Sequence, residues 1–74
     1  MKLDRITFDK DIMGGLACIR GMRITASLVI NLIANGMTSK QIISEYPDLD
    51  EEDIRQCLLY ASALAKDELH SIAG

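Results

Sequence analysis

The alternation of apolar and polar positions changes period once along the chain. In residues 6–8 a threonine is flanked by two large apolar side chains, a two-residue period typical of a short strand. A second strand is predicted over residues 16–20, after Gly14 and Gly15, because glycines take the positive φ that a turn needs. Residues 1–24 are therefore predicted to form a hairpin-like β arm, which is too thin to be stable alone.

From Thr25 the pattern becomes helical and almost wholly apolar, with Asn31 the one polar residue between 28 and 34. A helix that is apolar nearly all round is buried on more than one side. In this chain that predicts a central helix, a dimer seam, or both. Asn35 and Gly36 mark its end, since glycine adopts the left-handed conformation that follows a helix.

Two further helices follow. Thr38 and Gln41 form a capping box for a helix over residues 39–46, which Pro47 stops. Asp50 is the predicted N-cap of a third helix over residues 51–66 that continues, fraying, to about residue 72. The second helix is expected to bury Ile42, Ile43 and Tyr46. The third carries an apolar stripe at helical spacing, made of Ile54, Cys57, Leu58, Ala61, Leu64 and Ala65.

These elements predict one mainly α domain, a three-helix homeodomain-like helix-turn-helix over residues 25–74 with the short β arm before it. The last helix of such a motif enters the major groove of DNA. Among the positions expected to be exposed there, Arg55 and Gln56 suit guanine and adenine edges. Lys40 is the only cation on the second helix, and neighbouring carboxylates at 51 and 52 repel phosphate. A purely structural acidic helix start is the alternative.

Composition narrows the function classes. A chain of 74 residues with 49% hydrophobic side chains folds, but its core is marginal, so oligomerisation is the expected supplement. Two distant cysteines and one histidine make no zinc site of four ligands, and we expect Cys18 and Cys57 to be buried thiols. No convergent catalytic set, metal site or cofactor site is evident. For want of a catalytic set, we expect that the protein is not an enzyme. Because the chain has no membrane-spanning run and no leader, we expect it to be cytoplasmic.

Charge divides the chain into two unlike halves. Residues 1–40 carry six basic and three acidic side chains, whereas residues 41–74 carry two basic and eight acidic ones. The formal net charge of -3 is therefore the sum of +3 in residues 1–40, the basic front, and -6 in residues 41–74, the acidic rear. The basic front is expected to meet phosphate through Arg20 and Arg23, unless these arginines pair with Asp9 or Asp11 and hold the arm down. The acidic rear suits a basic partner protein.

Several motifs together resemble domain-of-unknown-function family 433. They are Ile6-Thr7-Phe8-Asp9, Ile12-Met13-Gly14-Gly15, Cys18-Ile19-Arg20-Gly21, Arg23-Ile24, Tyr46-Pro47-Asp48-Leu49 and Asp53-Ile54-Arg55. Members of the family are small homeodomain-like helical proteins, commonly interpreted as antitoxins encoded beside a PIN-like nuclease toxin. The resemblance implies DNA binding and toxin neutralisation.

The leading hypothesis is thus a dimeric antitoxin that neutralises a PIN-like nuclease and represses its own operon. The alternative is a protein-interaction module with the same fold that does not bind DNA. The residues predicted to contact operator DNA are Arg20, Arg23, Lys40, Arg55 and Gln56. Those predicted to contact the toxin are Asp67, Glu68, Leu69 and Ile72. Those predicted to form the dimer interface are Ile6, Phe8, Leu28, Leu32 and Ile33.

Overall fold

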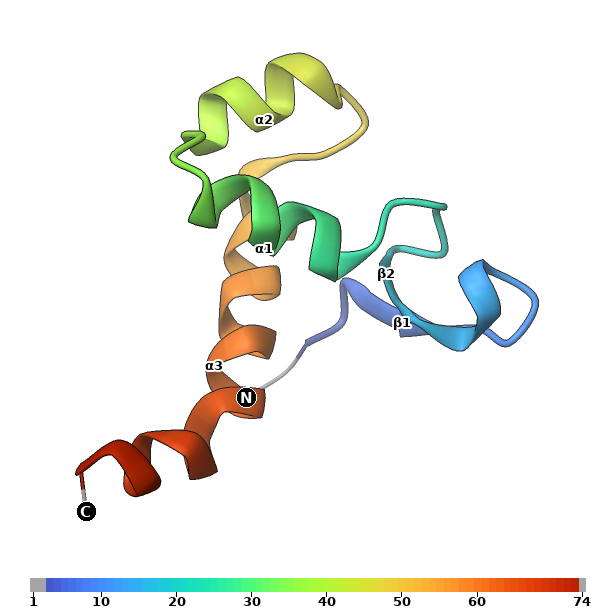
Figure 1. Cartoon of the computed structure of the whole chain (residues 1–74). Coiled ribbons are helices and arrows are strands. Elements are labelled where there is room, and N and C mark those ends of the chain that lie inside the picture. The colour runs from blue at the N-terminus through green and yellow to red at the C-terminus, as the bar shows by residue number, and fades with distance from the viewer. Residues whose placement is uncertain (1–2, 74) are drawn as a thin grey trace.

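The chain folds into a small, mainly helical domain with an N-terminal β arm, as the sequence predicts. The computed structural model describes residues 3–73, and the surroundings of side chains up to residue 66. The elements in chain order are β1 (Ile6–Phe8), the 3-10 turn η1 (Met13–Gly15), β2 (Ala17–Ile19), α1 (Ala26–Ala34), α2 (Ser39–Glu45) and α3 (Glu51–Ala73) (Figure 1).

The arm is a two-stranded antiparallel sheet. Ile6 pairs with Ile19 and Phe8 with Ala17, so each pair lies on one face of the sheet. The second strand is shorter than the predicted residues 16–20. Ile6 and Ile19 are buried in the core of the domain, which ties the arm to the helices.

Both short helices have an N-cap threonine, and the cap of α2 is the one that the sequence predicts. Thr25 caps α1 by accepting a hydrogen bond from the Leu28 N–H, and Thr38 and Gln41 form a reciprocal capping box on α2. At the end of α1, Gly36 has a φ of 94°. Its N–H and that of the next residue donate to carbonyl groups of the last turn, which is the Schellman arrangement.

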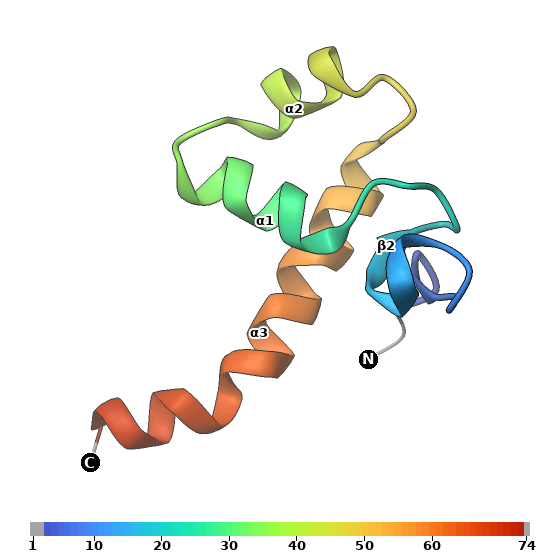
Figure 2. The same cartoon turned by 45° about the vertical axis from the view of Figure 1, so that its right-hand side comes forward.

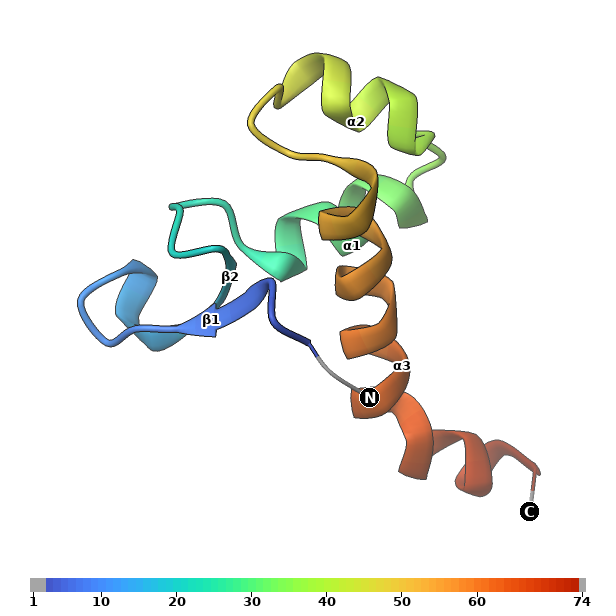
Figure 3. The same cartoon turned by 180° about the vertical axis from the view of Figure 1, so that it is seen from behind.

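Helix α3 is the longest element and extends beyond the rest of the domain. Its 23 residues correspond to about 35 Å. The first half lies against α1, behind it in Figure 1 and in front of it in the reverse view of Figure 3, whereas the second half projects away from the other elements (Figures 2 and 3). The core is formed where the arm, α1, α2 and the first turns of α3 meet. It contains Ile6, Ile19, Ala26, Val29, Ile42, Leu49, Ile54 and Cys57.

Two residues of the stripe predicted on the third helix are not covered. Ile54 and Cys57 are buried, but Leu58 is 44% exposed and Leu64 is 64% exposed. The predicted apolar stripe is therefore only partly buried, because the rest of the chain covers only part of α3. The second helix does bury Ile42, with Ile43 and Tyr46 half-buried against the core.

Candidate functional site

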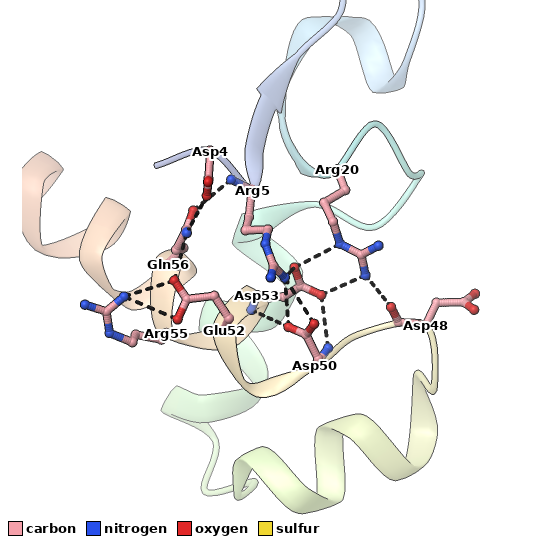
Figure 4. A network of polar contacts seen from close by, with 9 residues as sticks. All are labelled: Asp4, Arg5, Arg20, Asp48, Asp50, Glu52, Asp53, Arg55 and Gln56. Atoms are coloured by element: carbon pink, nitrogen blue, oxygen red, sulfur yellow. Dashed lines mark hydrogen bonds and ion pairs between the residues drawn. The ribbon is translucent and has the colours of Figure 1, made fainter. Parts of the chain in front are cut away.

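The start of α3 holds a buried carboxylate with two arginine partners. The Asp53 side chain has no exposed surface and lies between Arg5 and Arg20, both from the arm (Figure 4). Arg20 donates from Nε to Oδ1 at 3.0 Å and from Nη2 to Oδ2 at 2.9 Å. Nη1 of Arg5 donates to Oδ1 at 2.8 Å. The buried charge is thus compensated by two cations that lie side by side at the open end of the hairpin, where the Arg20 N–H donates to the Arg5 carbonyl at 2.8 Å.

Asp50 completes this cluster. Its Oδ1 accepts a hydrogen bond from the Asp53 N–H at 2.9 Å, and its own N–H donates to Asp53 Oδ2 at 3.0 Å. The pair therefore forms a capping box in which both side chains are carboxylates. Asp50 also accepts from Arg5 Nη1 at 2.9 Å, and Arg20 donates to the Asp48 carbonyl. We call Arg5, Arg20, Asp50 and Asp53 the Asp53 cluster.

The electrostatics of the cluster favour its charged form. Burial alone raises the pKa of Asp53, but the hydrogen bonds from Arg20 and Arg5 outweigh burial and lower that pKa to about 2. The same bonds raise the pKa of both guanidinium groups above its ordinary value. Asp53 and its two arginine partners are therefore ionised near neutral pH, and their ion pairs fix the arm to the start of α3.

Gln56 makes a second tie between the arm and α3. Its Oε1 accepts from the Arg5 N–H at 2.8 Å, and its Nε2 donates to Asp4 at 2.7 Å and to Glu52 at 2.9 Å. Only 3% of the residue is exposed. The prediction that Gln56 is exposed for contact with a base is wrong, because its amide is occupied inside the domain.

The other predicted DNA contacts are placed differently from one another. Arg20 is held by Asp53, so the predicted pairing with Asp9 or Asp11 is wrong in its partner and right in holding the arm down. Arg55 lies on the surface but binds Glu52 at 3.0 Å. Arg23 and Lys40 are exposed, and neither forms an ion pair with the described part of the chain.

An apolar groove lies beside the cluster, between the start of α2 and the first half of α3. Its volume is about 350 Å³, and its floor is formed by Ile54, Leu58 and Leu59. Ser39, Glu51 and Arg55 form its rim, and the Ser39 hydroxyl donates to Glu51 at 3.1 Å. We call this the α2–α3 groove.

Glu51 is the one carboxylate that lines the α2–α3 groove, and other carboxylates lie in the α2–α3 connection and at the neighbouring helix ends. Glu45, Asp48, Asp50 and Glu51 are all exposed, and Glu52 is half-exposed. Of these, Asp50 is neutralised by Arg5 and Glu52 by Arg55. The surface at the start of α3 therefore combines exposed apolar side chains with net negative charge.

The thiols have no chemistry to offer in the folded state. Both Cys18 and Cys57 are buried and unpaired by disulfides, as the sequence predicts. Burial, with a contribution from the Asp53 charge, raises the pKa of Cys57 to about 11, so its reactive thiolate is scarce. Among the described residues no group of three or more metal-ligating side chains comes together. No helix in the same part of the chain has the length and apolar character to cross a bilayer.

The remaining predicted site residues divide into two sets. The predicted toxin contacts, Asp67, Glu68, Leu69 and Ile72, lie outside the residues whose side chains are described. In the predicted dimer interface, Ile6 is buried in its own core, so its assignment to an interface is wrong. Leu28, Leu32 and Ile33 are half-buried, the last two against the core. Phe8 is 63% exposed.

Sequence reasoning missed the Asp53 cluster. It explained Asp53 by the preference for negative charge in a first helical turn, and it gave Arg5 no role. A signal was present, because one arginine precedes the first predicted strand and another ends the second, and α3 begins with an Asp-x-x-Asp capping pattern. Their meeting depends on how the arm packs on the helices, which spacing does not reveal.

Comparison with known proteins places this architecture in a family. The family model described as "Protein of unknown function (DUF433)" matches residues 6–61. An uncharacterized protein, y4eO of Sinorhizobium fredii (strain NBRC 101917 / NGR234), is 34% identical over 58 residues. The match covers 78% of this chain and 26% of that protein, so the chain spans about a quarter of its curated relative.

A solved structure agrees with the fold. The crystal structure of a DUF433 member protein from Anabaena variabilis ATCC 29413 superimposes with a TM-score of 0.78 at 25% sequence identity. The superposition covers 96% of this chain and 70% of that one. The chain therefore belongs to the DUF433 family of proteins of unknown function.

Proposed function

We propose that this chain is a non-enzymatic protein-binding module, and that its α2–α3 groove holds a basic segment of a partner protein. One observation carries the proposal. At the start of α3, where a helix-turn-helix presents residues to base edges, Arg20 and Gln56 are engaged in holding the arm. What remains on this surface is an apolar groove with Glu51 and Arg55 on its rim, and the exposed carboxylates Asp48 and Asp50 precede Glu51 in the chain.

The charge of this surface argues against DNA. DNA binding draws much of its affinity from Lys and Arg side chains that neutralise phosphates, and each phosphate neutralised adds about 0.9 to the slope by which log affinity falls with log salt. Of the predicted DNA contacts, only Arg23 and Lys40 are exposed without a partner in the described residues. The exposed carboxylates of Glu45, Asp48 and Glu51 repel the phosphate backbone of DNA. The geometry thus favours the protein-interaction hypothesis over operator binding.

The groove also specifies the partner's chemistry. Interfaces gain most of their affinity from a few apolar or aromatic anchors in pockets, bordered by polar contacts that steer association. Here Leu58 offers the exposed apolar contact and Glu51 the charged border. The matching segment carries an apolar side chain between lysines or arginines. The family resemblance adds the expectation that its owner is a PIN-like nuclease toxin, which this chain would neutralise as an antitoxin.

The test uses the full chain and the purified product of the neighbouring gene, titrated by calorimetry. We expect binding that weakens at least about tenfold in Leu58→Asp, since a charge enters the apolar floor. Glu51→Lys is expected to slow association and reduce its salt dependence. Leu64→Asp is the matched control, because it places the same charge on the same helix outside the groove.

A parallel titration with a duplex of the chain's own promoter addresses the DNA hypothesis. We expect no binding beyond the weak, salt-sensitive level of non-specific contacts. Tight, sequence-specific binding that is lost in Arg55→Ala and Lys40→Ala would overturn the proposal in favour of an operator-binding repressor. Equal partner binding by the parent chain and Leu58→Asp would move the interface away from the α2–α3 groove.

A further inference from the structure

A second apolar surface lies on the other side of α3. A groove of about 290 Å³ runs between α1, the start of β2 and the outer part of α3. Leu16, Ile30, Tyr60 and Leu64 give it its apolar lining. Leu16 is 59% exposed and Leu64 is 64% exposed, so the groove is open and has apolar side chains on its edges. We call it the α1–α3 groove.

Phe8 extends the same surface onto the arm. It pairs across the sheet with Ala17, which lines the α1–α3 groove. Its ring also meets Tyr60 edge to face, with ring centroids 6.0 Å apart. Nevertheless 63% of Phe8 is exposed. Large apolar side chains gathered in this way mark a surface that is covered by another molecule.

The lining of the α1–α3 groove carries no charge. Its polar members are the neutral side chains of Thr25, Ser27 and Asn31. The carboxylates of the chain gather instead at the α2–α3 connection and the start of α3. A partner of opposite charge is therefore steered to the acidic surface. A molecule with the same net charge of -3 meets least repulsion at this neutral groove.

We propose that the α1–α3 groove binds a second copy of this chain in a two-fold symmetric dimer. Such an interface uses the same patch on both copies and must be self-complementary. The surface of the α1–α3 groove is self-complementary, because its cavity and its projecting leucines lie side by side. In the dimer, Leu64 of each copy enters the groove of the other, and Leu16 and Phe8 pack around it.

The length of α3 supports the same occupant. The helix continues well past the core, and Leu64 has little cover from its own chain. Helical segments that lack tertiary packing are marginal in water, so the outer half of α3 gains stability from a partner. A domain of 74 residues also has a small core that association supplements. Of the interface predicted from sequence, the proposed seam keeps Phe8 and does not use Ile6, Leu28, Leu32 or Ile33.

The two grooves lie on different faces of one helix. Leu58 and Leu64 are six residues apart, which places them about 120° apart around α3. A dimer through the α1–α3 groove therefore leaves both α2–α3 grooves free. Self-association is independent of the proposed function and is tested separately from it.

The experiment is sedimentation equilibrium of the full chain over about 1 to 100 µM, a range in which ordinary dimers dissociate. We expect a dimer for the parent chain and a rise of at least about thirtyfold in the dissociation constant for Leu64→Asp. Leu16→Asp tests the opposite edge of the groove and is expected to act likewise. Leu58→Asp is the control and is expected to leave the dimer intact. Circular dichroism checks that each variant is folded.

Three results would overturn the inference. One is a parent chain that is monomeric throughout this range. Another is a dimer that persists unchanged in both Leu64→Asp and Leu16→Asp. The third is a dimer that Leu58→Asp dissociates as strongly as Leu64→Asp, which would assign self-association to the α2–α3 groove. Titration with the neighbouring gene product remains a separate readout, since Leu64→Asp is expected to bind it with unchanged affinity per chain.

Discussion

Replacing Asp53 by asparagine tests whether the buried carboxylate holds the arm on the helices. The change keeps the size of the side chain and one acceptor oxygen, but it removes the charge that faces Arg5 and Arg20. Removing one partner of a buried ion pair costs about 3–5 kcal/mol when the other charge stays buried. Here the arginine side chains are 28% and 39% exposed, so water rehydrates them.

The pKa of Asp53 supplies a second measure of the same interaction. Its ordinary value of 3.8 falls to about 2 in the folded chain. Since one pH unit is worth about 1.4 kcal/mol, ionised Asp53 contributes about 2–3 kcal/mol to folding. Both routes agree on a loss of about 2–3 kcal/mol for Asp53→Asn at neutral pH. A domain of this size has a total stability of about 4–11 kcal/mol, so the loss is large.

The assay is urea unfolding, because urea adds no salt that would screen the pair. A carboxylate whose pKa is lowered by folding stabilises the chain above its unfolded pKa, here near 3.8, and stops doing so as the pH falls through about 2. The gap between the parent chain and Asp53→Asn is therefore expected to be full at pH 7 and to close between about pH 5 and pH 2.

Asp48→Asn is the matched control, since it makes the same chemical change at an exposed carboxylate. It is expected to change stability by less than about 0.5 kcal/mol. The reasoning is refuted if Asp53→Asn unfolds within that margin of the parent chain at pH 7. A gap that does not close in acid would likewise show that lost packing, and not lost charge, is responsible.

Three further predictions each concern a single residue. Gln56→Leu leaves the Arg5 N–H without its acceptor and is expected to lower the free energy of unfolding by about 1–3 kcal/mol in the same urea assay. Gly36→Ala forces a side chain to a φ of 94°, and since its Cβ would meet no atom within 4 Å, the cost is conformational only, about 1–2 kcal/mol. Cys57, whose pKa is raised to about 11, is expected to resist alkylation at pH 8 until urea unfolds the chain, and rapid labelling of the folded chain would contradict this.

The sequence predicts the elements of this fold well because their signals are local. Thr38 with Gln41, and Asn35 with Gly36, fix helix ends through bonds within one turn, and the structure has those bonds. The predicted β arm and helices are confirmed for the same reason. The extent of burial is less predictable. Leu58 and Leu64 have the spacing of core residues, yet whether they are covered depends on how far the other elements reach along α3.

The candidate site shows why a sequence pattern typical of DNA-recognition helices is weak evidence that a helix binds DNA. Arg20 and Gln56 are residue types that bind DNA, and their positions along the chain suit that role. The same donors and acceptors are the ones that a buried carboxylate and an unpaired backbone N–H require. The arm brings Arg5 and its N–H to α3, so these requirements arise within the chain itself. Only the packing of the arm decides between the two uses.

That packing also explains how one short chain can offer two separate surfaces. The polar ties from the arm are concentrated on the first two turns of α3, at Asp53 and Gln56. They leave Leu58 free on one side and Leu64 free on another. These polar contacts are poorly suited to binding DNA but hold the arm firmly on α3. They do so without using the exposed leucines. The buried polar cluster therefore serves as the internal support for two grooves whose linings are mainly apolar.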